Sequence, residues 1–121
     1  MGKYVVKTVP SGIKFDLKAG NGEVIATSEV YTTKAACLKG LASVRKNAPA
    51  ANVEDQTVEG FKKAKHPKFE VYQSKDDEFR FRLKASNGQI IATSEGYTTK
   101  KSCLNGVESV KENAADSEIA E

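Results

Sequence analysis

The chain of 121 residues contains one segment twice, so any fold proposed for it must accommodate two equivalent units. Residues 17–48 align without a gap with residues 83–114, at a fixed offset of 66, and 21 of these 32 positions are identical. Each unit of about 46 residues is close to the size, roughly 40 residues, below which a chain buries too little surface to fold alone. We therefore expect the two units to pack about a pseudo-twofold axis as one monomer.

Each unit begins with a pattern typical of strands. Apolar and charged residues alternate along residues 79–85 and again along 13–19, as expected for strands that are buried on one face. Asn-Gly at 21–22 and at 87–88 predicts a two-residue hairpin loop of type I′, in which both loop residues have positive φ. An earlier strand is predicted over 68–74. Residues 3–9 fit an equivalent strand in two ways, because a one-residue slip would align Tyr4 with Phe69.

A helical pattern follows in each unit. Thr32 is the predicted N-cap, and the first helix has one apolar stripe that the second helix repeats, formed by Cys37, Leu41, Val44 and Ala48. Gly40 and Gly106 lie inside the helices, where glycine costs up to about 1 kcal/mol relative to alanine. We expect a close contact at each glycine to compensate. Val53 and Ile119, which are related by the offset, carry weak strand signals after the helices.

Several short segments, taken in order, resemble the unit of the YegP-like family of uncharacterised bacterial and archaeal proteins: "FRFRLKA", "NG", "IIATSE", "YTTK" and "NGVESVKENA". The resemblance implies an α+β fold of two tandem β3-α-β repeats related by a pseudo-twofold. The repeats would form one antiparallel sheet with the helices packed on one face and the C-terminal strands exchanged. We place the first repeat at 1–58, a linker at 59–66 and the second repeat at 67–121. The family brings no established activity.

Composition limits the classes of protein to which the chain can belong. The apolar runs are far shorter than the roughly 20 residues that cross a bilayer, and the first residues lack a secretory pattern. We therefore expect a cytoplasmic protein, in which Cys37 and Cys103 stay reduced. The net charge of +3 does not by itself indicate nucleic acid as a partner.

Few residues suggest a metal, cofactor or redox site. The single histidine, His66, lies in the linker without a spaced set of cysteines, so we expect no metal. Gly20-Asn21-Gly22 lacks the rest of a dinucleotide or P-loop motif, so we expect no cofactor. The equivalent positions of Cys37 and Cys103 permit a redox pair across the axis, but their place on an apolar stripe favours burial in the core.

Two polar features remain as candidate sites. Ser28-Glu29 and Ser94-Glu95 lie in the near-identical run and suggest an active site, although strand-ending roles explain them better, so we assign no catalytic residue. We expect a non-enzymatic binding or accessory module of unknown partner. The alternative is a nucleic-acid surface on the sheet, formed by Lys14, Lys18, Arg80, Arg82 and Lys84. Stacking aromatics are missing from that face, which favours an ion-paired, solvated surface.

Overall fold

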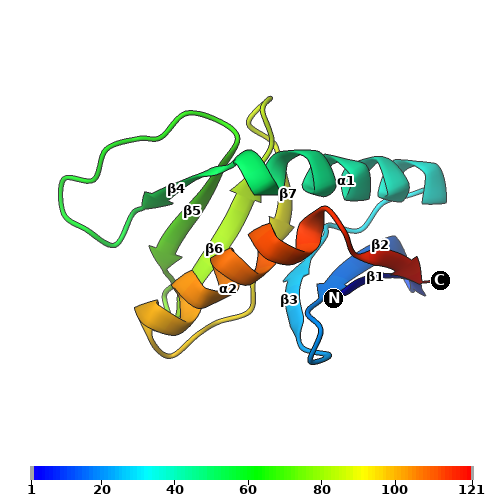
Figure 1. Ribbon diagram of the computed structural model, residues 1–121, viewed down its shortest axis with the longest axis horizontal. Helices are drawn as coiled ribbons and strands as arrows, with labels where there is room; N and C mark the ends of the chain where they lie inside the picture. The colour runs from blue at the N-terminus through cyan, green and yellow to red at the C-terminus, as the bar shows by residue number, and fades with distance from the viewer. Residues whose placement is uncertain (1, 121) are drawn as a thin grey trace.

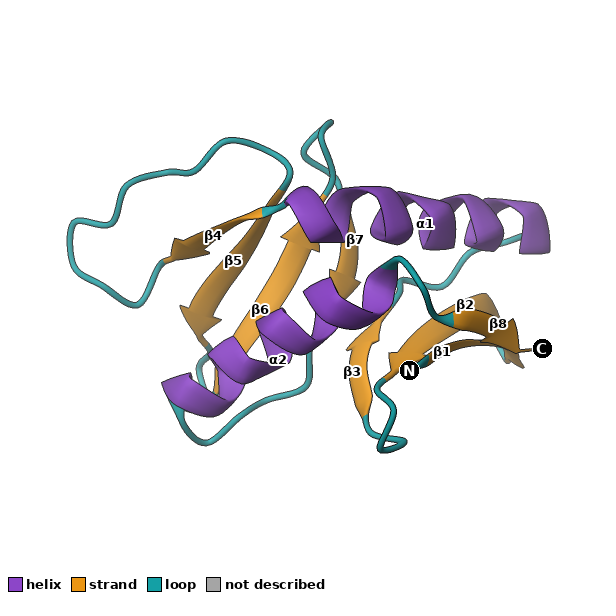
Figure 2. Ribbon diagram, viewed as in Figure 1, coloured by secondary structure: helices purple, strands orange, loops and turns teal. Residues whose placement is uncertain are grey.

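Two helices lie on one side of an eight-stranded sheet in the computed structural model, which describes residues 2–120 (Figure 1). The first repeat supplies β1 (Lys3–Val9), β2 (Gly12–Lys18), β3 (Val24–Thr27), α1 (Lys34–Asn47), a 3₁₀ turn (Ala48–Ala50) and β4 (Asn52–Asp55). The second supplies β5 (Lys68–Gln73), β6 (Phe79–Lys84), β7 (Ile90–Thr93), α2 (Lys100–Ala114) and β8 (Glu118–Ala120). Figure 2 shows both helices in front of the sheet. No helix within residues 2–120 is long and apolar enough to cross a membrane.

The sheet order, β4-β5-β6-β7-β3-β2-β1-β8, confirms the exchange of C-terminal strands. Strand β4 of the first repeat pairs with β5 of the second, and β8 pairs with β1. Both exchanged strands run parallel to their new neighbours, so the sheet is mixed and mostly antiparallel. The reason is that each exchanged strand follows a helix, which returns the chain across the sheet before the strand begins. The two halves meet at one pair, Thr27 with Thr93.

The first strand adopts the slipped register. Tyr4 pairs with Leu17 as Phe69 pairs with Leu83, so Tyr4 is the structural equivalent of Phe69. The rings keep equivalent edge-to-face contacts, with centroids 5.8 Å apart for Tyr4 and Phe15 and 5.7 Å apart for Phe69 and Phe81. The slip arises because only residues 10–11 separate β1 from β2, whereas the β5–β6 turn closes at Ser74 and Glu78 around one more residue.

The Asn-Gly hairpin has a different loop from the one predicted. The Ala19 amide donates to the Glu23 carbonyl at 2.9 Å, so the loop has three residues, 20–22. Only Gly22 has positive φ, at 86°, and the Asn21 side chain accepts from the Glu23 amide at 3.0 Å. This is a type I turn followed by a left-handed glycine, which asparagine-glycine sequences also suit. A bulge between Leu17 and Lys18 then lets Leu17 pair with Ala26.

The helix starts lie one residue later than predicted. Thr33, not Thr32, is the N-cap of α1, because its backbone is extended and its hydroxyl accepts from the Ala36 amide at 3.1 Å. Thr99 caps α2 in the same way. The predicted close contacts at the helix glycines are confirmed, and the neighbours are tyrosines: a Cβ on Gly40 would lie 2.1 Å from the Tyr31 hydroxyl oxygen.

The core lies between the helices and the sheet. The predicted helix stripe of Cys37, Leu41, Val44 and Ala48 is buried, as is its counterpart in α2. On the sheet, the fully buried aromatic side chains come from both repeats: Tyr4, Phe15, Phe69 and Phe81. Because the two hydrophobic stripes face one continuous apolar sheet surface, the repeats share a single core.

Candidate functional site

The five predicted cations do share the sheet face that points away from the helices, but most of them are paired with carboxylates. Arg82 Nε lies 2.6 Å and Lys84 Nζ 3.3 Å from the two Glu70 oxygens. Lys14 Nζ lies 3.1 Å from Asp16. Arg80 contacts Asp76 and Glu78 at 3.4 Å each. Lys18 alone of the five has no ion pair to another residue in 2–120. The face is therefore largely neutralised.

A buried ion cluster lies under this face. Lys68 Nζ is 2.8 Å from Glu54 and 3.2 Å from Glu70, and all three side chains are almost completely buried. Burial alone would raise the pKa of Glu54, but hydrogen bonds from Lys68, Gln56 and the Ala64 amide outweigh it and lower that pKa to about 2. Lys68 is not among the residues predicted for a site from the sequence, where it is only the first residue of the predicted strand 68–74. Its place beside the apolar Phe69 on that strand was the available signal.

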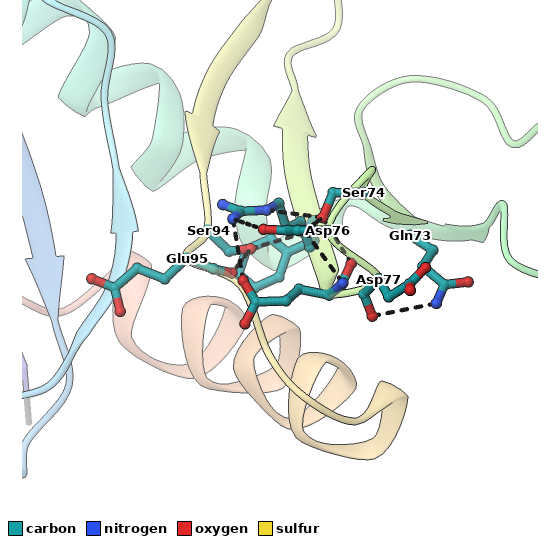
Figure 3. Close-up of polar contacts among 9 residues, drawn as sticks. Gln73, Ser74, Asp76, Asp77, Ser94 and Glu95 are labelled. Atoms are coloured by element: carbon teal, nitrogen blue, oxygen red, sulfur yellow. Dashed lines mark hydrogen bonds and ion pairs between the residues drawn. The ribbon is translucent and has the colours of Figure 1, made fainter.

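The β5–β6 turn forms an acidic rim beside the face (Figure 3). Ser74 donates to Asp76, and Asp77 has a left-handed backbone with φ of 64°. Glu78 fills the space above Gly96, where a Cβ would lie 2.2 Å from its carboxylate oxygen. In the first repeat the small residue and the large residue change places. Gly12 is equivalent to Glu78 and leaves room for Val30, which is equivalent to Gly96. Arg80 in the second repeat therefore has the acidic partner Glu78, whereas the first repeat has Gly12 at the position equivalent to Glu78.

The two serines of the near-identical runs, Ser28 and Ser94, form hydrogen bonds with backbone groups. Ser28 Oγ accepts from the Phe15 amide at 2.9 Å and donates to the Glu29 carbonyl at 2.7 Å. Ser94 repeats both contacts with Phe81 and Glu95. Figure 3 shows the Glu95 side chain extending away from the labelled residues of the turn. These hydroxyls therefore link the chain directly after β3 to β2, and the chain directly after β7 to β6.

Both cysteines are fully buried and free. Burial raises the pKa of Cys37, and it raises the pKa of Cys103 to about 11 with a smaller contribution from Asp55. We expect neither thiol to react with a disulfide reagent in the folded protein, and both to react in denaturant. A thiol introduced on the exposed side of α1 by Ala35→Cys is the control. Rapid modification of either native cysteine would contradict the prediction.

Two grooves of similar size lie at equivalent places in the repeats. One, of about 350 Å³, lies between α1 and the β6–β7 hairpin of the other repeat. Its counterpart, of about 340 Å³, lies between α2 and the β2–β3 hairpin. Four of their lining positions are related by the offset of 66, and these are Lys39 and Asn105, Ser43 and Ser109, Ala85 and Ala19, and Asn87 and Asn21. The pseudo-twofold thus places a groove of similar volume between each helix and the hairpin of the other repeat.

The two grooves differ in charge. The exposed stripe of α1 carries Lys39 and Lys46, whereas the same stripe of α2 carries Asn105, Glu108 and Glu112. In the part of the chain from 2 to 120, neither Lys39 nor Lys46 contacts a carboxylate. Lys46 also lines the α1 groove together with Lys39 and Ser43. Asn47 donates to Ser43 Oγ at 3.0 Å, which leaves the Ser43 hydroxyl with a proton to donate. Sequence reasoning missed this groove, because its walls come from different repeats.

His66 and the acidic side chains do not form a metal centre. Residues 2–120 contain no group of three or more histidine, cysteine or carboxylate side chains arranged to hold a metal ion. His66 lies in the β4–β5 loop, where its ring is 3.7 Å from the position that a Cβ on Gly88 would occupy.

Comparison with known proteins supports the repeat assignment. A family described as "Domain of unknown function (DUF1508)" matches residues 12–55 and again 74–121. The UPF0339 protein YegP of Escherichia coli O157:H7 is 40% identical over 113 residues, which are 93% of this chain and 89% of that protein. The solution structure of YegP from E. coli, a protein of unknown function, gives a TM-score of 0.79 at 36% identity, covering 98% of this chain and 90% of that one. A UPF0339 protein of Shewanella oneidensis gives 0.78 at 37% identity, with 98% and 88% covered. The chain therefore belongs to the DUF1508, or UPF0339 YegP, family, and it carries the family's domain twice.

Proposed function

We propose that this protein is a non-enzymatic binding module that holds an anionic ligand in the groove between α1 and the β6–β7 hairpin, termed the α1 groove. The observation that carries the proposal is the charge difference between two grooves of similar volume at equivalent places in the repeats. Lys39 and Lys46 lie seven residues apart, about two helical turns, so both face the same groove. The counterpart groove, with Asn105 on its wall and Glu108 and Glu112 on the same stripe of α2, does not suit an anion.

The chemistry of the groove suits an oxyanion, for example a phosphoryl or carboxylate group. Lysine ammonium groups bind such ligands through charge-assisted hydrogen bonds. Ser43 and the Asn87 amide lie on opposite walls and supply neutral donors. Ser86 donates to Asn47 Oδ1 at 3.1 Å, which joins the hairpin to α1 and fixes the width of the groove.

A catalytic role for the repeated serines or the cysteines is less well supported than a binding role. The hydroxyl groups of Ser28 and Ser94 donate their protons to backbone carbonyls. The thiols have raised pKa values and lie in the core, so neither is poised as a nucleophile. These engagements support a binding role over an enzymatic one.

The test exchanges the residues of the two grooves. Lys39→Asn with Lys46→Glu gives α1 the side chains that α2 carries, and Asn105→Lys with Glu112→Lys makes the reverse change. In titrations with pyrophosphate followed by amide chemical shifts, we expect wild-type shifts around residues 39–47 and 86–88. The first variant should lose them, and the second should gain shifts around 20–22 and 105–113. Wild-type shifts that persist in the first variant, or no shifts at low salt, would overturn the proposal.

The alternative function is nucleic-acid binding through the outer sheet face. Its cations are those named from the sequence: Lys14, Lys18, Arg80, Arg82 and Lys84. Four of them are already paired, so displacing their carboxylates would cost part of any gain from phosphate contacts. Lys18→Gln with Arg80→Gln should weaken oligonucleotide binding if this face is used, and unchanged binding would exclude it.

A further inference from the structure

Three lysines without a carboxylate partner in the described chain lie close together in the β4–β5 loop, residues 56–67, which also carries the exposed Glu59. Lys62, Lys63 and Lys65 are all exposed, and in residues 2–120 none of them contacts a carboxylate. Phe61 lies directly before them, and 38% of the residue is exposed, although large aromatic residues are usually buried. The loop therefore presents three cations beside an accessible aromatic ring.

The backbone of this loop is fixed rather than loosely tethered. Buried Glu54 accepts from the Ala64 amide at 2.7 Å, and the Asn52 side chain donates to the Lys65 carbonyl at 2.9 Å. The Asn52 amide donates to the Pro67 carbonyl at 3.0 Å. Near the tip, the Phe61 amide donates to the Val58 carbonyl at 3.2 Å, and Gly60 supplies the positive φ of that turn. A ligand that binds here meets an ordered loop, so less conformational entropy is lost on binding.

The loop is continuous with the α1 groove. His66 lies against Gly88 of the β6–β7 hairpin, and the same hairpin forms one wall of the groove through Ser86 and Asn87. Figure 1 shows the returning end of the green loop beside this hairpin and the C-terminal end of α1. The hairpin and His66 thus connect Lys39 and Lys46 at one end with Lys65 at the other, and this surface is termed the path.

We propose that this path binds single-stranded nucleic acid, with its phosphates on the lysines and a base stacked on Phe61. The inference rests on the proposed function, since the α1 groove is one end of the path. Groups of cations along an extended surface with a stacking ring are the features used by sequence-independent single-strand binders. A small anion would fill only the groove and leave the loop lysines without a role. A duplex would keep its bases paired and could not stack one on Phe61.

The experiment measures fluorescence anisotropy with labelled single-stranded DNA and RNA of about 4 and about 16 nucleotides. We expect the longer strands to bind more tightly, and log K to fall with log salt at a slope of about −3.5, or about −0.7 for each of five lysine–phosphate contacts. Lys62→Gln, Lys63→Gln and Lys65→Gln together should reduce the slope by about 2. Phe61→Ala should weaken binding about tenfold, and Phe61→Tyr should preserve it. Lys3→Gln, Lys75→Gln and Lys101→Gln together, three exposed lysines elsewhere, form the matched control.

The outcomes separate the two proposals. If the loop variant binds the long strands as wild type does while the Lys39→Asn, Lys46→Glu variant does not, the path is overturned and the groove remains. If pyrophosphate fails to shift the groove residues but the loop variant still lowers strand affinity, the groove proposal fails alone. No binding of either strand at about 50 mM salt overturns the path. Vesicles of phosphatidylserine form a separate arm, and vesicle binding that depends on Phe61 without strand binding would also overturn it.

Discussion

Replacing Lys68 with methionine is expected to destabilise the protein by about 3–5 kcal/mol, because Glu54 would stay buried without its cation, while Glu70 would keep Arg82 and Lys84. Methionine keeps most of the side-chain volume, so the loss reports charge rather than packing. Urea unfolding followed by circular dichroism measures it.

The structurally equivalent lysine gives the control. Lys3 lies opposite Lys18 as Lys68 lies opposite Lys84, but Lys3 is exposed. Lys3→Met should therefore change the free energy of unfolding by less than about 0.5 kcal/mol. Replacing both partners, with Glu54→Leu added to Lys68→Met, should recover part of the loss, since the buried carboxylate that has lost its cation is removed. If Lys68→Met alone lies within about 1 kcal/mol of wild type, the cluster does not have the energetic role assigned to it.

Gly40→Ala should also destabilise, even though alanine is the better helix former by about 1 kcal/mol. The added Cβ would lie 2.1 Å from the Tyr31 hydroxyl oxygen and 2.7 Å from Cζ, so the ring has to move. Overpacking of this kind costs about 1–3 kcal/mol, and we expect the net effect to be in that direction. Thermal unfolding monitored by circular dichroism gives the measurement.

Two further variants separate the clash from helix propensity. Ala42→Gly, on the exposed stripe of α1, should cost about 1 kcal/mol and so reports propensity alone. In a double-mutant cycle, Gly40→Ala should be tolerated much better when Tyr31 is already alanine. A Gly40→Ala protein more stable than wild type would show that the tyrosine yields easily. Gly106 with Tyr97 offers the same cycle in the second repeat.

The sequence alone was sufficient for the order of elements, because periodicity of two and of 3.6 residues is local information. It also supported the exchanged strands, through the resemblance and the relation of Val53 to Ile119. It could not choose the register of β1. That choice depends on the length of the following turn, which is one residue shorter in the first repeat, and both registers have an apolar residue to bury.

The candidate site was less predictable, because ion pairing joins residues that are distant in sequence. Glu54 and Lys68 meet across two strands from different repeats, and Arg82 finds Glu70 on the neighbouring strand. The alternation on β6 correctly placed its cations on one face, but it carried no information about the carboxylates beside them. The α1 groove was hidden for the same reason. Its lysines and its hairpin belong to different repeats and meet only in the folded chain.

The pairing of β8 with β1 brings the two ends of the described chain together, with Lys3 opposite Glu118 (Figure 1). Each repeat thus closes the sheet of the other, and the polypeptide comes close to forming a ring. Within residues 2–120 its longest connection is the β4–β5 loop, which lies at the edge of the sheet opposite the edge formed by β1 and β8. In such a ring the order in which the repeats are encoded does not determine their contacts. A gene that began with the second repeat would specify the same sheet, with the chain ends and the exposed loop exchanging places.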